Sequence, residues 1–290
     1  MQFLVYLIVY PLLWLISILP FRLLYAFSDV VYILIYRIIG YRTKTVQANL
    51  KLALPHLSDK ERKRIEKTFY KHLCDMFLEM VKTMGISQKE MEKRFKLTNL
   101  DVYKNLETKG KSIALITAHY ATYEWIISMN KHISFDGYAI YKKLANPHFD
   151  KLVKNIRSKF EAYLIDTKET PAVIERNKEE NRLSVYGFAS DQSPKAGKAH
   201  HWTTFMGATV PVHTGAEMLA KKYDMNVILL EVTKVKRGFY EAHFEVPFED
   251  VQAVPDYQIT DYFLRKLEKQ ILRKPEYYLW THKRWKHKRD

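Results

Sequence analysis

The sequence predicts an α/β protein in which helices flank a mixed central sheet and an N-terminal helix anchors the chain to a membrane. Short apolar segments alternate with segments of helical periodicity from residue 112 onward, and residues 3–19 carry no charge. The 290 residues are 47% hydrophobic and include no linker rich in Gly, Ser or Pro. We therefore expect two parts, a membrane anchor with an interfacial helix over residues 1–40 and one globular domain over residues 41–290.

Two apolar segments form the predicted anchor region. Residues 3–19 are at the short end of the roughly 17–25 residues that span a bilayer core, and they lack the basic start and the cleavage site of a signal peptide. In residues 21–39, Arg22, Asp29 and Arg37 fall near one face of a helix, which is typical of a helix lying at the membrane interface. The alternative is that both segments form a helical hairpin buried within the domain.

The elements of the globular domain follow from local patterns. Residues 41–55 and 58–84 are predicted helices, the second beginning with a capping box of Ser58 and Glu61, and residues 85–109 are a mixed, charged connection. Strands are predicted over residues 112–118, 137–141, 183–188, 227–232 and 240–246. Further helices are predicted to begin at Thr122 and to cover residues 146–160, 213–222 and 261–272.

His119 and Glu124 lie on the predicted turn between the strand 112–118 and the helix that Thr122 would cap. On one continuous helix, a spacing of five would turn the two side chains about 140° apart. On a turn they can meet, and the pair then suits base catalysis, because the imidazole takes a proton from a hydroxyl while the carboxylate fixes its tautomer. The alternative is a structural hydrogen bond at a helix start, and the spacing alone favours that alternative.

Composition limits the possible chemistry. The net charge of +15 indicates an anionic partner, which can be nucleic acid, an acidic protein or phospholipid headgroups. Cys74 is the only cysteine, which excludes an intrachain disulfide and a thiolate cluster, and its apolar surroundings indicate packing. The sequence has no phosphate-binding loop, no Gly-x-Ser-x-Gly, no Gly-x-Gly-x-x-Gly and no His-Glu-x-x-His. We therefore expect no metal site and no nucleotide cofactor.

Other candidate residues each have a second interpretation. Arg157 lies near the end of the helix 146–160 and can belong to a solvated basic face. Asp191 and Gln192 follow the strand 183–188, where open α/β sheets place functional groups, but Asp191 is equally typical of a turn. Gly207 permits either a tight turn or a close approach of substrate.

The segment His119-Tyr-Ala-Thr-Tyr-Glu124 resembles the His-x-x-x-x-Asp/Glu motif of lysophospholipid acyltransferases, in the branch containing the lauroyl and myristoyl lipid A late acyltransferases of Gram-negative bacteria. Similar family features follow in order: an Asn-Pro helix with an arginine, an Ala-Asp-Gln segment, an aromatic-Gly loop and a Trp-x-His-basic ending. The resemblance covers about residues 10–286. It departs from the family at Ala121 and Thr122, where many relatives carry Gly-Asn, and at Met206, where an aromatic is common.

The resemblance implies an O-acyltransferase of lipid A and lipopolysaccharide biosynthesis, with residues 41–290 as its catalytic domain. A fatty acyl chain would move from a thioester on acyl carrier protein, or on coenzyme A, to a hydroxyl of an anionic lipid A precursor. His119 would be the base and Glu124 would hold the imidazole, without metal or cofactor. The implied substrate-binding residues are Arg157, Asp191, Gln192 and Gly207.

The expected location is the bacterial inner membrane with the catalytic domain on the cytoplasmic face, because basic residues follow the first apolar segment. The expected partners are acyl carrier protein, the lipid acceptor and the membrane, and no nucleic acid. We also expect the C-terminal basic residues to give a surface field that attracts the acidic carrier protein; these are Lys283, Arg284, Lys286, Lys288 and Arg289. A glycerophospholipid or an aminolipid is the alternative acceptor. The rival of another class is a non-catalytic basic protein that binds membrane surfaces or nucleic acid.

Overall fold

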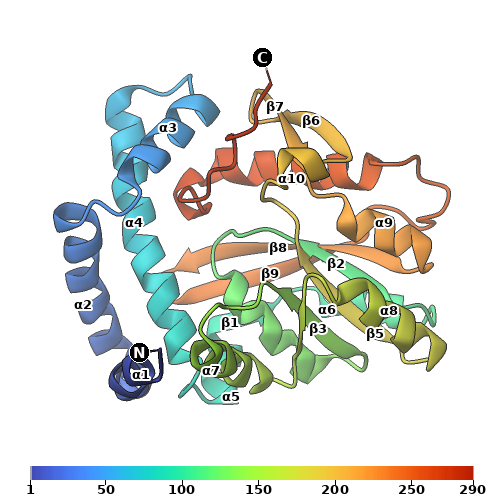
Figure 1. Ribbon diagram of the computed structural model, residues 1–290, viewed down its shortest axis with the longest axis horizontal. Helices are drawn as coiled ribbons and strands as arrows, with labels where there is room; N and C mark the ends of the chain where they lie inside the picture. Colours follow the sequence, from blue (N-terminus) through green and yellow to red (C-terminus); the bar gives the residue numbers. More distant parts are fainter. Residues whose placement is uncertain (1, 290) are drawn as a thin grey trace.

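The computed structural model describes residues 2–289, so the outer ends of the two predicted parts, Met1 and Asp290, lie outside it. Its centre is a seven-stranded sheet with the order β1-β9-β8-β2-β5-β3-β4 (Figure 1). All neighbouring strands are parallel except β8 and β9, so the sheet is mixed as predicted. The strands are β1 (Phe95–Leu97), β2 (Ile113–Thr117), β3 (Asp136–Tyr141), β4 (Tyr163–Asp166), β5 (Ser184–Ala189), β8 (Asn226–Lys236) and β9 (Phe239–Glu245).

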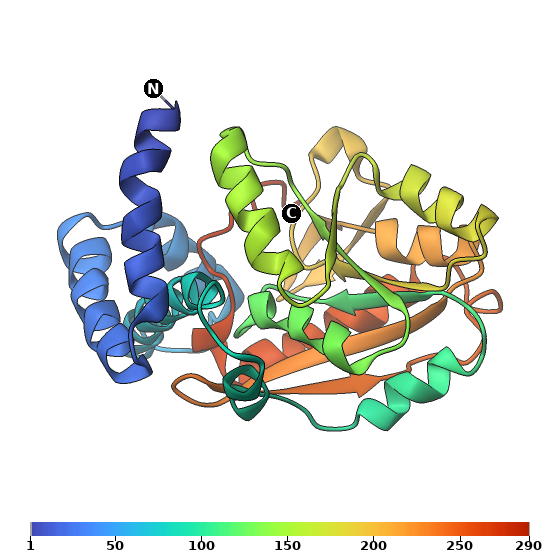
Figure 2. The same ribbon diagram turned by 90° about the horizontal axis from the view of Figure 1, so that it is seen from below.

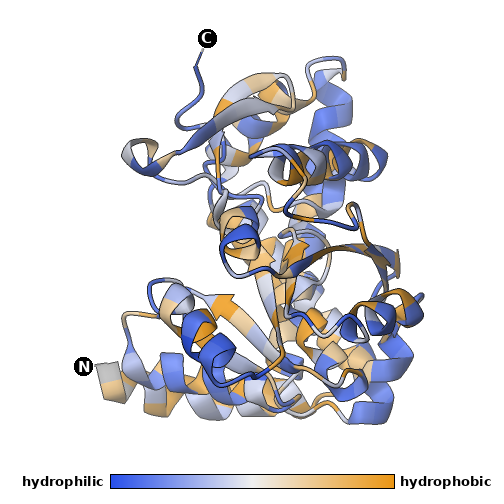
Figure 3. Ribbon diagram, turned by 90° about the vertical axis from the view of Figure 1, so that its right-hand side faces the viewer, coloured by the Kyte–Doolittle hydropathy of each residue, from blue (hydrophilic) through white to orange (hydrophobic). Residues whose placement is uncertain are grey.

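Helices surround this sheet, and a separate antiparallel hairpin of β6 (His201–Phe205) and β7 (Ala208–Val212) packs against α10. Figure 3 shows hydrophobic residues concentrated in the central strands and hydrophilic residues on the outer helices. All five residues of β2 are buried, which fits a strand with neighbours on both sides and helices on both faces. The helices of this domain are α5 (Gln88–Arg94), α6 (Leu100–Glu107), α7 (Pro147–Ser158), α8 (Thr170–Glu179), α9 (Gly215–Lys222) and α10 (Gln258–Arg273).

The N-terminal quarter is helical. It comprises α1 (Gln2–Ile18), α2 (Phe21–Tyr32) with a π-helical continuation η1 (Ile33–Ile38), α3 (Thr43–Ala53) and α4 (Asp59–Lys82). In residues 2–289, no helix taken alone has both the length and the apolar composition to cross a membrane; the segments 21–38 and 43–53, bent by 86°, meet that test only as a pair. The membrane anchor therefore stays a prediction.

Polar contacts attach these helices to α4 and to the chain beyond it. Ser28 on α2 donates to the Asp75 carboxylate (2.7 Å), and the Lys82 ammonium donates to the Ser17 and Leu19 carbonyls (both 2.7 Å). In Figure 2, α1 stands beside α7, in agreement with the contact between the rings of Phe3 and His148. The opposite sides of α1 and α2 leave large apolar side chains exposed, among them Ile8, Leu12, Leu15, Leu23 and Val30.

Long patterned segments were predicted well. The five predicted strands correspond to β2, β3, β5, β8 and β9, and the capping box of Ser58 and Glu61 at the start of α4 is present. Cys74 packs in the core, and burial raises the pKa of its thiol to about 12. The prediction for residues 85–109 was wrong, because this connection folds into α5, β1 and α6. These elements are short and charged, so their periodicity extends over too few residues to be recognised.

The segment after His119 also differs from its prediction. Instead of an α-helix capped by Thr122, residues Tyr123–His132 form a 3-10 helix, η2, and the Thr122 side chain makes no capping hydrogen bond. Ala121 has a left-handed backbone with φ +50°, and its N–H donates to the Tyr277 carbonyl (2.9 Å). That contact with a distant part of the chain sets the entry into η2, which local sequence signals do not report.

Candidate active site

The register of two central strands brings His119 opposite Asp191. β2 and β5 are parallel, Thr117 pairs with Ala189, and the Ser190 N–H donates to the Thr117 carbonyl (3.0 Å). His119 lies two residues after Thr117 and Asp191 two residues after Ala189. Both are therefore at the carboxyl edge of the sheet, where α/β proteins place functional groups.

Asp191 holds the His119 imidazole. One oxygen of the carboxylate lies 2.7 Å from His119 Nδ1 and accepts the His119 backbone N–H at 2.9 Å. The Asp191 side chain is 1% exposed and that of His119 is 21% exposed, so the imidazole can still be reached from outside. A hydrogen on Nδ1 leaves Nε2 with a free lone pair.

The charges around His119 favour its protonated form. Burial lowers the pKa of the imidazole, but the carboxylates of Asp191 and Glu124 outweigh burial and the repulsion from Arg157, so the pKa lies above its ordinary value. For Asp191 burial has the opposite effect and raises the pKa of the carboxyl group. The charge and hydrogen bonds of His119 outweigh burial, so that the pKa of Asp191 is lowered. Asp191 therefore stays ionised beside an imidazole that accepts a proton readily.

Glu124 does not hold the imidazole, contrary to the prediction. Its carboxylate forms a two-pronged ion pair with Arg157 of α7, with Nε–Oε2 at 3.0 Å and Nη2–Oε1 at 2.8 Å. The two side chains are 10% and 18% exposed. The prediction failed because it considered only residues near in sequence, whereas Arg157 and Asp191 reach the site from other elements. The pair still borders His119, since its charges shift the pKa of the imidazole.

Gln192 and Gly207 have different surroundings. Gln192 follows Asp191 directly and is partly exposed. Gly207 lies in the two-residue turn of the β6–β7 hairpin, with φ +79° next to φ +49° at Met206, and this pair of positive angles is typical of a tight hairpin turn. The turn interpretation of Gly207 thus accounts for its conformation, and its contact with substrate stays a prediction.

The C-terminal segment contributes neighbours that sequence reasoning missed. The Leu279 N–H donates to the His119 carbonyl (3.2 Å), and the backbones of Tyr278 and Tyr120 form an isolated antiparallel β-bridge. The ring of Tyr123 packs edge-on against the His119 imidazole, with centroids 4.8 Å apart. The only sequence signal for these contacts was the dense aromatic content of both segments.

One member of the predicted C-terminal basic surface is not at the surface. Arg284 is 1% exposed and donates to the Pro211 carbonyl (3.0 Å), so it cannot attract a partner from solution. The prediction was wrong because Arg284 stands among lysines in the sequence, and the neighbouring Lys283 and Lys286 are indeed exposed. Asn49 of α3 also contacts this segment, since its amide donates to the Trp280 and His282 carbonyls (both 2.8 Å).

A family model described as bacterial lipid A biosynthesis acyltransferase matches residues 1–287. The chain belongs to this family. This acyltransferase is 22% identical over 275 residues to the lipid A biosynthesis lauroyltransferase of Escherichia coli K12, across 94% of the chain and 89% of the relative. It is 22% identical over 256 residues to the lipid A biosynthesis palmitoleoyltransferase of the same organism and to a lipid A biosynthesis acyltransferase of Shigella flexneri, in each case across 84% of the chain and 79% of the relative.

The prediction of an acyltransferase is thereby confirmed against the non-catalytic alternative. The geometry of the acyltransferase provides a group able to accept a proton, Nε2 of His119, and a buried carboxylate that fixes its tautomer. It also provides a guanidinium, Arg157, which is fixed by Glu124 and keeps Nη1 outside that ion pair. A base beside a fixed cation suits an acceptor that carries both a hydroxyl and an anionic group.

Proposed function

We propose that this acyltransferase moves a fatty acyl chain from a thioester, carried by acyl carrier protein or coenzyme A, to a hydroxyl of a lipid A precursor. The observation that carries the proposal is the short contact between His119 Nδ1 and Asp191 in a chain whose relatives are named lipid A acyltransferases. That contact gives the imidazole the tautomer that a general base needs.

In the proposed reaction, Nε2 of His119 takes the proton of the acceptor hydroxyl while the oxygen attacks the thioester carbonyl. The charge on the resulting imidazolium is balanced by Asp191, whose carboxylate accepts its Nδ1–H. The tetrahedral intermediate then collapses, the carbon–sulfur bond breaks, and the thiolate takes the proton from His119. The products are an ester and a free thiol, and the enzyme returns to its starting state without a covalent intermediate.

Glu124 acts in this proposal by orienting Arg157. The ion pair fixes the plane of the guanidinium, and Nη1 then donates to an anionic group of the acceptor. Gln192 lies next to Asp191 at the same edge of the sheet and is the candidate donor or acceptor to a polar group of the substrate. Gly207 keeps its expected substrate role only as a proposal, since its backbone already serves the hairpin turn.

The proposed setting is the cytoplasmic face of the bacterial inner membrane, with α1 and α2 in contact with lipid. Apolar side chains on one side of α1 are exposed by half or more, including Ile8 at 69% and Leu12 at 55%. A large exposed apolar surface is typical of a membrane contact. Replacing Ile8 and Leu12 by glutamate should reduce co-flotation of the purified protein with vesicles of anionic phospholipid, and unchanged flotation would exclude this surface as the contact.

The reaction is tested by incubating the purified protein with acyl-carrier-protein and coenzyme A thioesters and with lipid A precursor, glycerophospholipid and aminolipid acceptors. Mass spectrometry identifies the acylated product. His119→Ala should lower the rate by about 10²–10⁴, the usual contribution of a positioned base. His132→Ala, which removes the histidine at the end of η2, is the control and should react as the parent does. Near-parental turnover by His119→Ala would contradict the proposed role of His119.

A further inference from the structure

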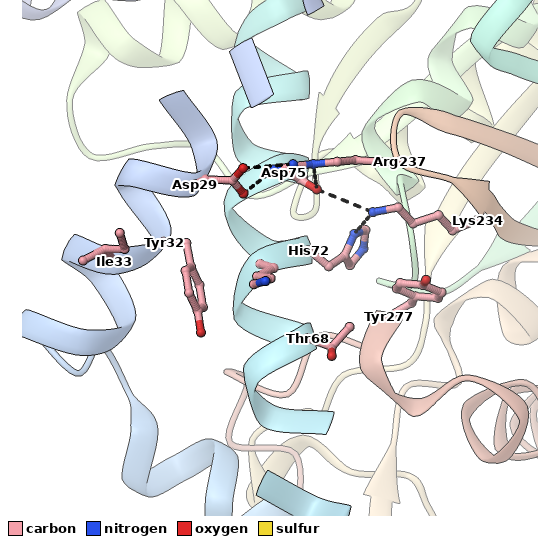
Figure 4. A pocket seen from close by; sticks show the side chains of 10 residues that line it. Asp29, Tyr32, Ile33, Thr68, His72, Asp75, Lys234, Arg237 and Tyr277 are labelled. Atoms are coloured by element: carbon pink, nitrogen blue, oxygen red, sulfur yellow. Dashed lines mark hydrogen bonds and ion pairs between the residues drawn. The ribbon is translucent and has the colours of Figure 1, made fainter. Parts of the chain in front are cut away.

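A polar cavity of about 510 Å³ lies between α2, α4, the β8–β9 turn and the segment Pro275–Tyr277 (Figure 4). Nothing in the proposed reaction uses it. Its lining residues are mainly charged or aromatic: Asp29, Tyr32, Ile33, Thr68, Lys71, His72, Asp75, Lys234, Arg237 and Tyr277.

The two carboxylates of the cavity are already supplied with donors. Asp75 accepts from Arg237 Nη2 (2.7 Å), from Arg237 Nε (2.9 Å) and from the Ser28 hydroxyl (2.7 Å). Asp29 accepts from Arg237 Nη2 at 2.8 Å and Nη1 at 3.2 Å. The chain of dashed lines in Figure 4 follows these pairs along one side of the cavity. One guanidinium thus satisfies both acids, and the cavity has little capacity left to bind a cation.

The groups of the cavity that can still bind a ligand are mostly hydrogen-bond donors, the ammonium groups of two lysines. The Lys234 side chain is 7% exposed, and its ammonium donates to His72 Nδ1 (3.1 Å) and lies 3.7 Å from Asp75. Burial lowers the pKa of Lys234, and the nearby carboxylates only partly offset that effect. Lys71, at the exposed rim, has the Tyr32 ring 5.6 Å away and pairs with no carboxylate in residues 2–289. Two ammonium groups in one cavity favour an anion with several acceptor oxygens.

The position of the cavity indicates what carries that anion. Ile33, which lines the cavity, is 52% exposed and belongs to the apolar outer side of the N-terminal helices. His72 and Tyr277 also line a much smaller cavity, of about 10 Å³, that reaches His119. A ligand with an anionic head and apolar chains can therefore place its chains along α2 and its head in the cavity, whose residues His72 and Tyr277 also face the way to His119.

We propose that this cavity binds the phosphate group of a lipid, through the ammonium groups of Lys71 and Lys234, with the acyl chains of the lipid lying against α2. The lipid is either the phosphorylated acceptor or a phospholipid of the surrounding membrane. The acceptor as source rests on the proposed function, whereas the phosphate site itself does not.

Binding is measured by phosphorus NMR on the purified full-length protein with dihexanoyl phosphatidic acid, which is soluble without forming vesicles. Dihexanoyl glycerol, with the same chains and no phosphate, competes for an apolar site but not for a phosphate site. We expect the phosphorus resonance to shift on binding to the parent. Lys71→Glu should weaken binding about tenfold or more, the size expected for losing a hydrogen bond to a charged group. Lys71→Arg should restore most of it, because the positive charge is kept.

Lys60→Glu is the matched control, since it makes the same charge change at an exposed position near the start of α4. It should bind phosphatidic acid as the parent does. A parent that shows no phosphorus shift, or a Lys71→Glu variant that binds as tightly as Lys60→Glu, would overturn the phosphate site. Displacement of the phosphatidic acid by dihexanoyl glycerol would overturn it as well, because the chains alone would then account for binding.

The two sources are separated by acyl-transfer kinetics. If Lys71→Glu has a higher KM for the phosphorylated acceptor, but an unchanged kcat and an unchanged KM for an acceptor stripped of its phosphates, the phosphate in the cavity belongs to the acceptor. Parental kinetics together with lost phosphatidic acid binding identify a membrane phospholipid. If neither the parent nor any variant transfers an acyl chain but phosphatidic acid still binds, the proposed reaction is refuted and the proposed phosphate site is not.

Discussion

Replacing Asp191 by asparagine tests the pair that organises the site. The Asp191 oxygen that receives Nδ1–H of His119 also accepts the His119 backbone N–H, and the backbone cannot turn away. The asparagine carbonyl should therefore keep the same two hydrogen bonds, so that the substitution removes the charge and preserves the geometry. The Tyr278 hydroxyl, which also faces the Asp191 carboxylate, can accept from the new amide.

The expected loss follows from that charge. A hydrogen bond to a charged group contributes about 1.5–3 kcal/mol, and about 1.36 kcal/mol corresponds to a factor of ten in rate. We therefore expect kcat to fall roughly 10- to 100-fold. A loss of the order of 10⁴ would instead indicate that the amide has turned its NH₂ group toward the imidazole and imposed the wrong tautomer.

The rate profile against pH gives a second readout. His119 must be neutral to act as a base, so kcat/KM falls as the pH drops through its pKa. Asp191 raises that pKa in the parent, and the asparagine variant should therefore lose activity at a lower pH than the parent does. Initial rates of ester formation across the pH range measure both effects. An Asp191→Asn enzyme with parental kcat and an unshifted acid limb would refute the assignment.

Three further predictions concern other parts of the molecule. Arg157→Lys should reduce kcat about tenfold at low and high salt alike, because an ammonium cannot form the two-pronged contact with Glu124; rates at two ionic strengths check this. Ser58→Ala should lower the free energy of unfolding by about 1 kcal/mol in urea titrations, through loss of the capping box. Burial raises the pKa of Glu79 from 4.5 to about 7, so the parent should lose unfolding free energy as the pH rises through that window, whereas Glu79→Gln should lose less of it.

Sequence alone predicted the parts of the fold that depend on long local patterns. The apolar run around β2 and the stripe of α4 each repeat over enough residues to define an element. β1, with three residues, and the short helix α5 carry too few repeats for the same reasoning, and tertiary contacts decide their structure. The π-helical segment η1 has no sequence pattern that distinguishes it from an α-helix.

The sequence pointed to the residues of the candidate site but not to which of them contact each other. His119, Glu124, Arg157 and Asp191 were all candidates from the sequence. In the structure His119 contacts Asp191 and Glu124 contacts Arg157, and the charges of the second pair act on the His119 imidazole. The pairing depends on strand register and on the position of α7, which are properties of the whole sheet. His119 and Asp191 are 72 residues apart, so nothing in the neighbourhood of either shows that they meet.

The pairing of β2 with β5 has a consequence for how enzymes of this design can diversify. The proposed base and its carboxylate directly follow two adjacent central strands, where a register change of one residue would move every side chain of a strand to the opposite face of the sheet. The cation of the site is delivered by α7, outside those strands. If the proposed roles hold, insertions, new helix lengths or different charges in α7 should alter which acceptors react, while His119 and Asp191 keep their positions. A library randomised in α7 alone is the practical starting point for redirecting such a catalyst to new acceptors.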